Sequence, residues 1–155
     1  GAELLLICTN TMHLVADEIS AAISIPLLHI ADATASVINE AGLKSVGLLG
    51  TKFTMEKDFY RGLLADHGLD VVVPSQPDRD IVHRLIYEEL CLGRIKDKSR
   101  AEYLRIIDDL RQRGAEAVIE GCTEIGLLVK QEHTDVPLFD TTTIHAHEAV
   151  AAALK

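Results

Sequence analysis

A repeated segment constrains the fold of this chain more than any other feature of its sequence. Residues 1–10 and 114–124 follow the same order, which is Gly-Ala-Glu, a short apolar run and then Cys-Thr. An apolar stretch that contains a proline comes after each copy. The repeat predicts two similar halves, each of which supplies one cysteine: Cys8 from the first half and Cys122 from the second.

Apolar runs of strand length alternate with segments of helical spacing along the whole chain. The expected strands cover residues 4–7, 25–30, 45–51, 69–73, 115–119 and 136–139. The first expected helix begins near Met12, the second covers 31–41, and a single helix lies between the third strand and Gly68. Two further helices cover 79–92 and 99–113. A short helix ends at Leu128, and the last one starts at Thr141. Such alternation predicts an α/β fold with parallel sheets flanked by helices, in which ligands collect at the carboxyl ends of the strands. Both Cys-Thr elements fall at such ends.

The two copies of the repeat differ in what precedes them. Two strands and three helices, over residues 45–113, lead into the second copy, whereas nothing precedes the first. We therefore expect two pseudo-symmetric lobes, of which the first is incomplete. Residues 1–30 and 140–155 would form the remnant of the N-terminal lobe, and residues 31–139 a complete second α/β lobe. The alternative is a natural short form that completes its sheet by dimerising.

The charge of the chain narrows the class of its partners. A formal net charge of -9 argues against nucleic acid, whose phosphates require clustered Lys and Arg. The sequence has no basic amphipathic face of the kind that binds an anionic membrane. No apolar run approaches the roughly 20 residues of a membrane span, and no signal peptide is recognisable. We expect a cytoplasmic protein that binds a small metabolite.

The three cysteines are odd in number and widely separated, which indicates neither a disulfide framework nor a zinc ribbon. Cys8 and Cys122 each lie where a strand leads into a helix, and a helix N-terminus favours the thiolate form. Two thiols facing each other could act on one carbon from opposite sides, one removing a proton and the other returning one, at roughly 3 to 3.5 Å from that carbon. Burial as small hydrophobic residues is the alternative interpretation, and a redox pair would lack the usual neighbouring cysteine.

Four motifs resemble those of the aspartate/glutamate racemase family, and the likeness runs over essentially the whole chain. They are Cys-Thr-Asn-Thr-Met-His at 8–13, Pro-Leu-Leu-His-Ile at 26–30, Leu-Leu-Gly-Thr at 48–51 and Gly-Cys-Thr-Glu at 121–124. The bacterial broad-specificity aspartate/glutamate racemases are the most similar branch. The resemblance implies two α/β lobes with the active site between them, no cofactor, no metal and a homodimer. The family's first strand and its glycine turn have no counterpart in this chain.

The resemblance also implies roles for individual residues. Cys8 and Cys122 would be the two bases, and the expected substrate-binding residues are Thr9, Asn10, Thr11, Thr51, Thr123 and Glu124. Backbone N–H groups at the two helix starts suit an α-carboxylate, and the Asn and Thr side chains add hydrogen bonds. Glutamate racemases carry a histidine where this chain has Glu124, which favours the aspartate or broad-specificity branch. Glu124 would either receive the substrate ammonium or cap its helix.

The remaining candidates have simpler interpretations. We interpret His13, His29 and His145 as packed or hydrogen-bonded scaffold groups in preference to a proton relay, and no histidine pair has the spacing of a zinc site. Cys91 lies in a helical stripe and is predicted to belong to the core.

The sequence thus predicts a cofactor-independent amino-acid racemase that interconverts the enantiomers of aspartate, glutamate or a similar small amino acid. Two alternatives stay open. The first is a catalytically incompetent fragment that acts as an amino-acid-binding module, and the second is an enzyme similar to hydantoin racemases.

Overall fold

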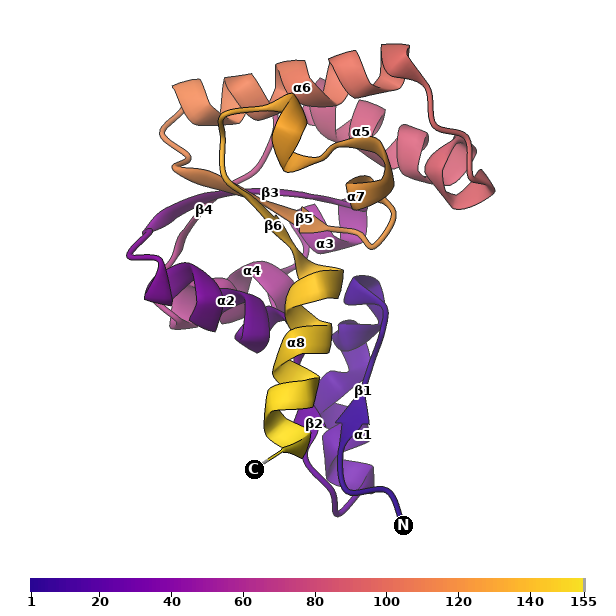
Figure 1. The fold of residues 1–155 in the computed structure, drawn as a ribbon, viewed down its shortest axis with the longest axis vertical. Helices are drawn as coiled ribbons and strands as arrows, with labels where there is room; N and C mark the ends of the chain where they lie inside the picture. The colour runs from indigo at the N-terminus through magenta and orange to yellow at the C-terminus, as the bar shows by residue number, and fades with distance from the viewer. Residues whose placement is uncertain (155) are drawn as a thin grey trace.

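The computed structural model describes residues 1–154, which form two parallel sheets flanked by helices (Figure 1). The larger sheet has four strands in the order β4-β3-β5-β6, all parallel: β3 (Ser45–Gly50), β4 (Asp70–Val72), β5 (Ala117–Gly121) and β6 (Leu138–Asp140). The smaller sheet pairs β1 (Leu5–Leu6) with β2 (Leu27–Leu28), also in parallel. The predicted α/β fold with parallel sheets flanked by helices is therefore confirmed.

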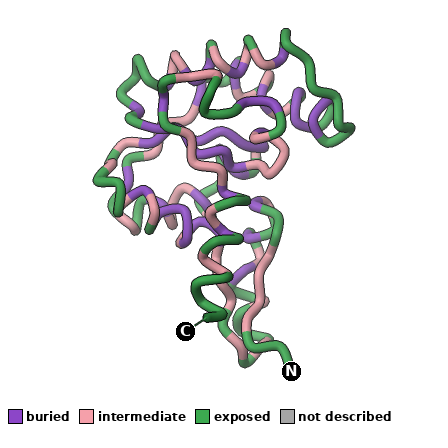
Figure 2. The backbone as a smooth tube through the Cα atoms, in the orientation of Figure 1, coloured by how far each residue is buried: buried purple, intermediate pink, exposed green. Residues whose placement is uncertain are grey.

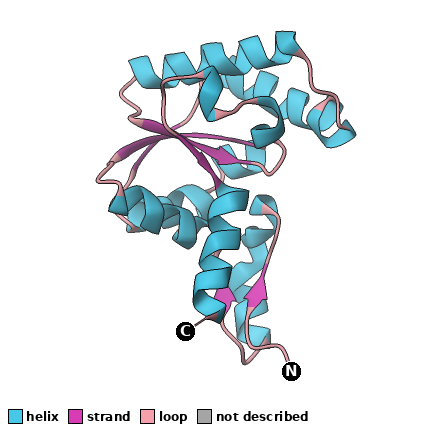
Figure 3. Cartoon of the chain, in the orientation of Figure 1, coloured by secondary structure: helices cyan, strands magenta, loops and turns pink. Residues whose placement is uncertain are grey.

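Helices cover both faces of the larger sheet. The α-helices are α1 (Ala16–Ala22), α2 (Ile30–Glu40), α3 (Lys52–Glu56), α4 (Asp58–Asp66), α5 (Gln76–Glu88), α6 (Asp97–Gln112), α7 (Ile125–Leu128) and α8 (Thr141–Ala153). Three short 3-10 helices complete the described chain: η1 (Asn10–Val15), η2 (Leu90–Leu92) and η3 (Gln131–His133). Helices α5 and α6 lie on one side of the sheet and α2 and α4 on the other (Figure 3).

The core has two parts, one on each face of the larger sheet. Side chains of a strand alternate between the faces. Val118 of β5 accordingly packs in the cluster beneath α5 and α6, whereas Ala117 and Ile119 pack against α2 and α4. Burying a valine or isoleucine side chain, such as Val118 or Ile119, contributes about 1.5 to 3 kcal/mol. Figure 2 shows that buried residues gather around this sheet and become sparse toward both termini.

Strands β1 and β2 lie beside α8, away from the larger sheet (Figure 1). The His145 Nε2 atom of α8 lies 2.8 Å from the Leu28 carbonyl oxygen, which links this helix to β2. None of the helices in residues 1–154 is long and apolar enough to cross a membrane.

Several predicted boundaries were wrong, and two of them have a clear physical reason. The single helix expected before Gly68 is interrupted at Lys57, whose extended backbone separates α3 from α4. The strand expected to end at Ile30 stops at Leu28, because the His29 side chain accepts a hydrogen bond from the Ala31 N–H and so begins α2. In both places a local backbone change overrides the hydrophobic pattern.

Glu120, near the end of β5, is a charged side chain placed in the interior. It is 3% exposed and lies beside Asp140 in the β5–β6 register. Its Oε1 atom has no hydrogen-bond partner among the described residues. Burial, with a smaller effect of Asp140, raises the pKa of the Glu120 carboxyl to about 8. Glu120 is therefore mostly protonated in the folded chain near neutral pH.

This raised pKa predicts that folding stability falls as pH increases. Between its unfolded value of about 4.5 and its folded value of about 8, the folded chain holds a proton that the unfolded chain releases. Relative to Glu120→Gln, the chain should lose on the order of 3 kcal/mol of unfolding free energy between pH 5 and 8. Urea unfolding at several pH values measures the difference. The exposed control Glu18→Gln keeps Glu120, so its stability should fall with pH as that of the unmodified chain does. Parallel profiles for the chain and Glu120→Gln would contradict the assignment.

Candidate active site

A cavity of about 310 Å³ lies where the N-terminal segment meets the carboxyl ends of β3 and β5. The predicted site residues that line it are Thr9, Asn10, Thr11, Thr51, Cys122, Thr123 and Glu124. Cys8, which directly precedes Thr9, is exposed and is not among the lining residues. The cavity walls also include Met12, Ile86, Tyr87, Cys91 and Gly121, which the sequence did not single out as site residues.

Two glycines allow the strands to meet closely at this edge. Gly50 and Gly121 are paired at the ends of β3 and β5. A Cβ atom on Gly50 would lie 2.9 Å from the Gly121 carbonyl oxygen, and one on Gly121 would lie 2.8 Å from the Leu49 carbonyl oxygen. Only glycine fits both positions without moving the backbone. Thr51 and Cys122, which directly follow these glycines, therefore lie close together at the carboxyl edge of the sheet.

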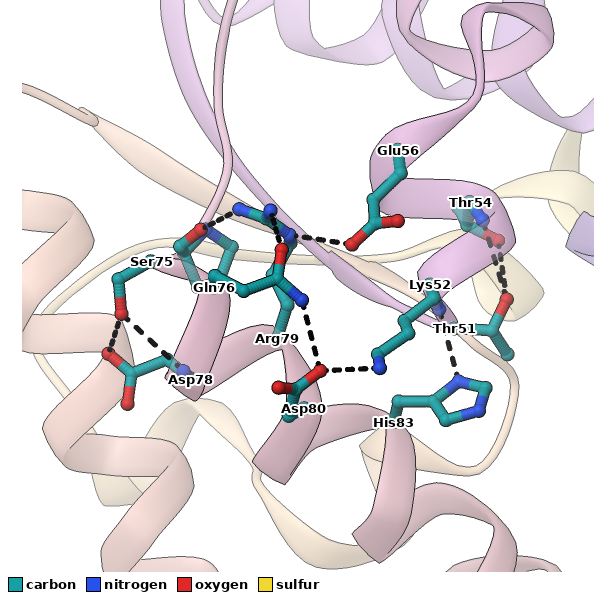
Figure 4. Close-up of polar contacts among 11 residues, drawn as sticks. Thr51, Lys52, Thr54, Glu56, Ser75, Gln76, Asp78, Arg79, Asp80 and His83 are labelled. Carbon is teal, nitrogen blue, oxygen red and sulfur yellow. Dashed lines mark hydrogen bonds and ion pairs between the residues drawn. The ribbon is translucent and has the colours of Figure 1, made fainter.

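Thr51 is fixed by contacts on two sides. Its Oγ1 atom accepts a hydrogen bond from the Thr54 N–H, which caps α3, and lies 3.2 Å from the Thr11 Oγ1 atom. Helix α3 is in turn held against α5 by polar contacts (Figure 4). They are the ion pairs Lys52–Asp80 and Arg79–Glu56 and a hydrogen bond from the Lys52 N–H to His83 Nδ1.

Asn10 is buried at the cavity wall with a defined amide orientation. Thr141 Oγ1 donates its single proton to the Glu120 carbonyl oxygen at 2.9 Å, so it must accept from the Asn10 Nδ2 group at 3.1 Å. The Asn10 Oδ1 atom then points elsewhere, and it has no hydrogen-bond partner among the described residues. The cavity wall thus contains a buried acceptor without a donor.

His13 supports the segment that carries these residues. Its Nε2 atom accepts from the Ile30 N–H at 3.2 Å, so its Nδ1 atom carries the proton and donates to the Thr9 carbonyl oxygen at 3.0 Å. Burial, reinforced by the nearby His29, lowers the pKa of His13 to about 4. This geometry favours the scaffold interpretation over a proton relay.

Cys122 and Glu124 form the polar centre of the cavity. The Cys122 Sγ atom and the Thr123 hydroxyl both donate to the Glu124 Oε2 atom at 2.9 Å. Burial of Glu124 alone would raise its pKa, but these donated hydrogen bonds outweigh that effect and hold the pKa below its usual value. Glu124 is therefore an anion. Its side chain makes no capping hydrogen bond to α7, so the capping role considered from the sequence is not observed.

The protonation of Cys122 differs from the sequence-based expectation. A helix N-terminus should favour its thiolate, but the pKa of this thiol is raised well above its usual value. Burial is the main cause, and the adjacent Glu124 carboxylate adds to it. The four-residue α7 offers too short a dipole to offset both effects. Cys122 is a protonated thiol in the free chain.

The prediction that Cys91 belongs to the core was wrong. Cys91 is exposed and lines the same cavity as Cys122. It lies in η2, a 3-10 turn that ends at Gly93 in the left-handed conformation. This turn changes the helical phase after α5, so that Leu90 stays buried while Cys91 faces the cavity. Partial burial and the Glu124 charge raise the pKa of the Cys91 thiol.

In the part of the chain that the structure describes, no group of three or more His, Cys, Asp or Glu side chains is arranged to hold a metal ion.

Comparisons with known proteins agree on one family. The model of the Asp/Glu/Hydantoin racemase family matches residues 1–149. A crystal structure of a putative Asp/Glu racemase from Yersinia pestis is 54% identical, with a TM-score of 0.95 over 100% of this chain and 68% of that one. An aspartate racemase homologue from Pyrococcus horikoshii OT3 is 39% identical, with a TM-score of 0.90 over 100% of this chain and 68% of that one.

A third relative has a functional name. The broad specificity amino-acid racemase RacX of Bacillus subtilis is 24% identical over 99% of this chain and 66% of its own length. This chain therefore spans about two thirds of the length of each of these relatives.

The contact between Cys122 and Glu124 predicts a change in thiol reactivity. Replacing Glu124 by Gln removes the negative charge and should lower the Cys122 pKa, so the thiolate fraction and the alkylation rate near pH 8 should rise about tenfold. Iodoacetamide labelling in a Cys8→Ser/Cys91→Ser background follows this thiol alone. The exposed control Glu132→Gln should leave the rate unchanged. Equal rates with and without the Glu124 carboxylate would show that burial alone sets the pKa.

Proposed function

Because the chain belongs to the Asp/Glu/hydantoin racemase family, we propose that it racemises a free amino acid at the α-carbon without a cofactor. Its relatives in this family are racemases, which are isomerases. Aspartate and glutamate are the substrates expected from the sequence. The observation that carries the proposal is the cavity at the carboxyl ends of β3 and β5, where hydrogen-bond acceptors and donors of the right kinds meet.

The cavity has complementary groups for both charged ends of an amino acid. Glu124 is an anion, so its carboxylate suits an α-ammonium group. The hydroxyls of Thr9 and of the Thr11–Thr51 pair can donate to an α-carboxylate, whereas the Thr123 hydroxyl already donates to Glu124. A hydantoin ring has N–H donors but no positive charge and would use Glu124 less well. This pairing favours a free amino acid as the ligand.

In the proposed reaction the two cysteines act on opposite faces of the α-carbon. The thiolate of one, Cys122 for one enantiomer, takes the α-proton, and the thiol of the other, Cys8, gives a proton to the opposite face of the carbanion. After this turnover Cys122 is a thiol and Cys8 is a thiolate. The enzyme is then ready for the reverse reaction, and it returns to its first state by proton exchange with water. Since Cys8 is exposed and outside the cavity lining, the proposal requires its segment to move toward the bound amino acid.

The raised pKa of Cys122 gives the substrate a role in activating its own base. The free site holds this thiol protonated beside the Glu124 anion. An α-ammonium group placed on Glu124 would cancel the charge that opposes ionisation of the thiol. The thiolate would then form mainly when an amino acid is bound.

One observation favours a second candidate function, an amino-acid-binding module without turnover. The Cys8 sulfur belongs to an exposed residue, and the lining of the cavity does not include it. If the segment did not move, only one face of the α-carbon would have a base.

Single cysteine variants separate these possibilities. We expect Cys8→Ser and Cys122→Ser to lose racemisation by at least a hundredfold, about 2.7 kcal/mol in the barrier. Exchange of the α-hydrogen in D₂O, followed by NMR, should survive from one enantiomer in Cys8→Ser and from the opposite enantiomer in Cys122→Ser. Serine keeps the size of the side chain but is a much weaker acid than cysteine.

The Cys91→Ser variant identifies the second base. It should keep exchange from both enantiomers if Cys8 is that base, whereas one-sided exchange would transfer the role to Cys91. Racemisation by Cys122→Ser at the parent rate would rule out the two-cysteine proposal. Binding of an amino acid without any exchange would favour the binding module.

A further inference from the structure

The charges that line the cavity bear on the substrate side chain. Glu124 is an anion, and none of the described residues lining the cavity is Lys or Arg. Lys52 directly follows Thr51, which lines the cavity, but its ammonium group pairs with Asp80 on α5 (Figure 4). A side-chain carboxylate would therefore enter a cavity that holds a negative charge and no cation.

The polar acceptors of the cavity suit only one end of an acidic amino acid. The Glu124 carboxylate can take the α-ammonium group, and the hydroxyls of Thr9, Thr11 and Thr51 can serve the α-carboxylate. The second carboxylate of aspartate or glutamate would have no cationic partner in the lining, because the α-ammonium group already pairs with Glu124. Taking a carboxylate out of water without a partner is costly, whereas the corresponding amide carries no charge.

The rest of the wall is apolar. Met12 from η1 and Ile86 and Tyr87 from α5 supply it. Met12 is 53% exposed and Tyr87 is 49% exposed, whereas Ile86 is buried. Because Met12 and Tyr87 are partly open to solvent, this wall can contact uncharged side chains of different lengths.

Building on the racemase function proposed above, we infer that the substrate is an amino acid with an uncharged side chain, in preference to aspartate or glutamate. This inference departs from the substrates expected from the sequence. It rests on the juxtaposition of the Glu124 carboxylate, which accepts from Cys122 and Thr123, with an apolar wall and no cation among the described lining residues.

Isosteric pairs test the inference on the unmodified chain. Calorimetry should give at least tenfold tighter binding of L-asparagine than of L-aspartate, and of L-glutamine than of L-glutamate. Exchange of the α-hydrogen in D₂O is measured on the same four compounds. Equal or tighter binding of the acids, or no binding of any of the four, would overturn the inference.

The two readouts keep this inference separate from the proposed racemase. Preference for the amides in binding, without exchange from any compound, would support the inference and defeat the racemase. Exchange that is fastest with aspartate or glutamate would support the racemase and defeat the inference.

A charged variant tests whether the apolar wall faces the side chain. Tyr87→Arg places a cation on this wall at a half-exposed position, and it should shift the aspartate-to-asparagine binding ratio at least tenfold toward aspartate. Val150→Arg adds the same charge at an exposed position of α8 outside the cavity lining and should leave the ratio unchanged. Circular dichroism verifies that both variants are folded. Identical ratios in folded Tyr87→Arg and Val150→Arg would show that the wall does not contact the side chain.

Discussion

The candidate site depends on a pair of hydrogen bonds that runs from Asn10 through Thr141 to the Glu120 carbonyl oxygen. It joins two positions 131 residues apart in the sequence and holds the N-terminal segment at the carboxyl edge of the larger sheet. The Thr11–Thr51 contact supports the same junction. Each such bond contributes only about 1 kcal/mol to stability, so its main effect is to position the groups it joins. The same geometry that anchors Asn10 buries its Oδ1 atom without a hydrogen-bond partner among the described residues.

Glu124 sets the electrostatics of the cavity. Its carboxylate accepts hydrogen bonds from Cys122 and Thr123, helps to keep the Cys122 thiol protonated, and supplies negative charge to a cavity without a lining cation. These effects point to one role in the proposed reaction, which is to receive an ammonium group. Binding of the ammonium would then neutralise the site and ease ionisation of the thiol. Substrate recognition and base activation would depend on a single charge.

Much of the fold could be predicted from the sequence because its signals are local. Buried apolar runs placed the strands, and the Gly-Cys-Thr-Glu motif placed Cys122 through Glu124 at the end of β5. Features set by tertiary contacts were missed. The phase change in η2 that turns Cys91 to the cavity, and the burial that raises the pKa of Cys122, have no signature in a hydrophobic pattern. The division into lobes and the role of Cys8 stay predictions.

A crystal structure with a bound amino acid tests the central claim most directly, namely that Cys8 and Cys122 flank one α-carbon. The account predicts the α-carbon roughly 3 to 3.5 Å from each sulfur, with the sulfurs on opposite faces. It also predicts the ammonium group within hydrogen-bond distance of the Glu124 carboxylate. A bound amino acid with the Cys8 sulfur still on the outer surface, or a ligand seated outside this cavity, would contradict it.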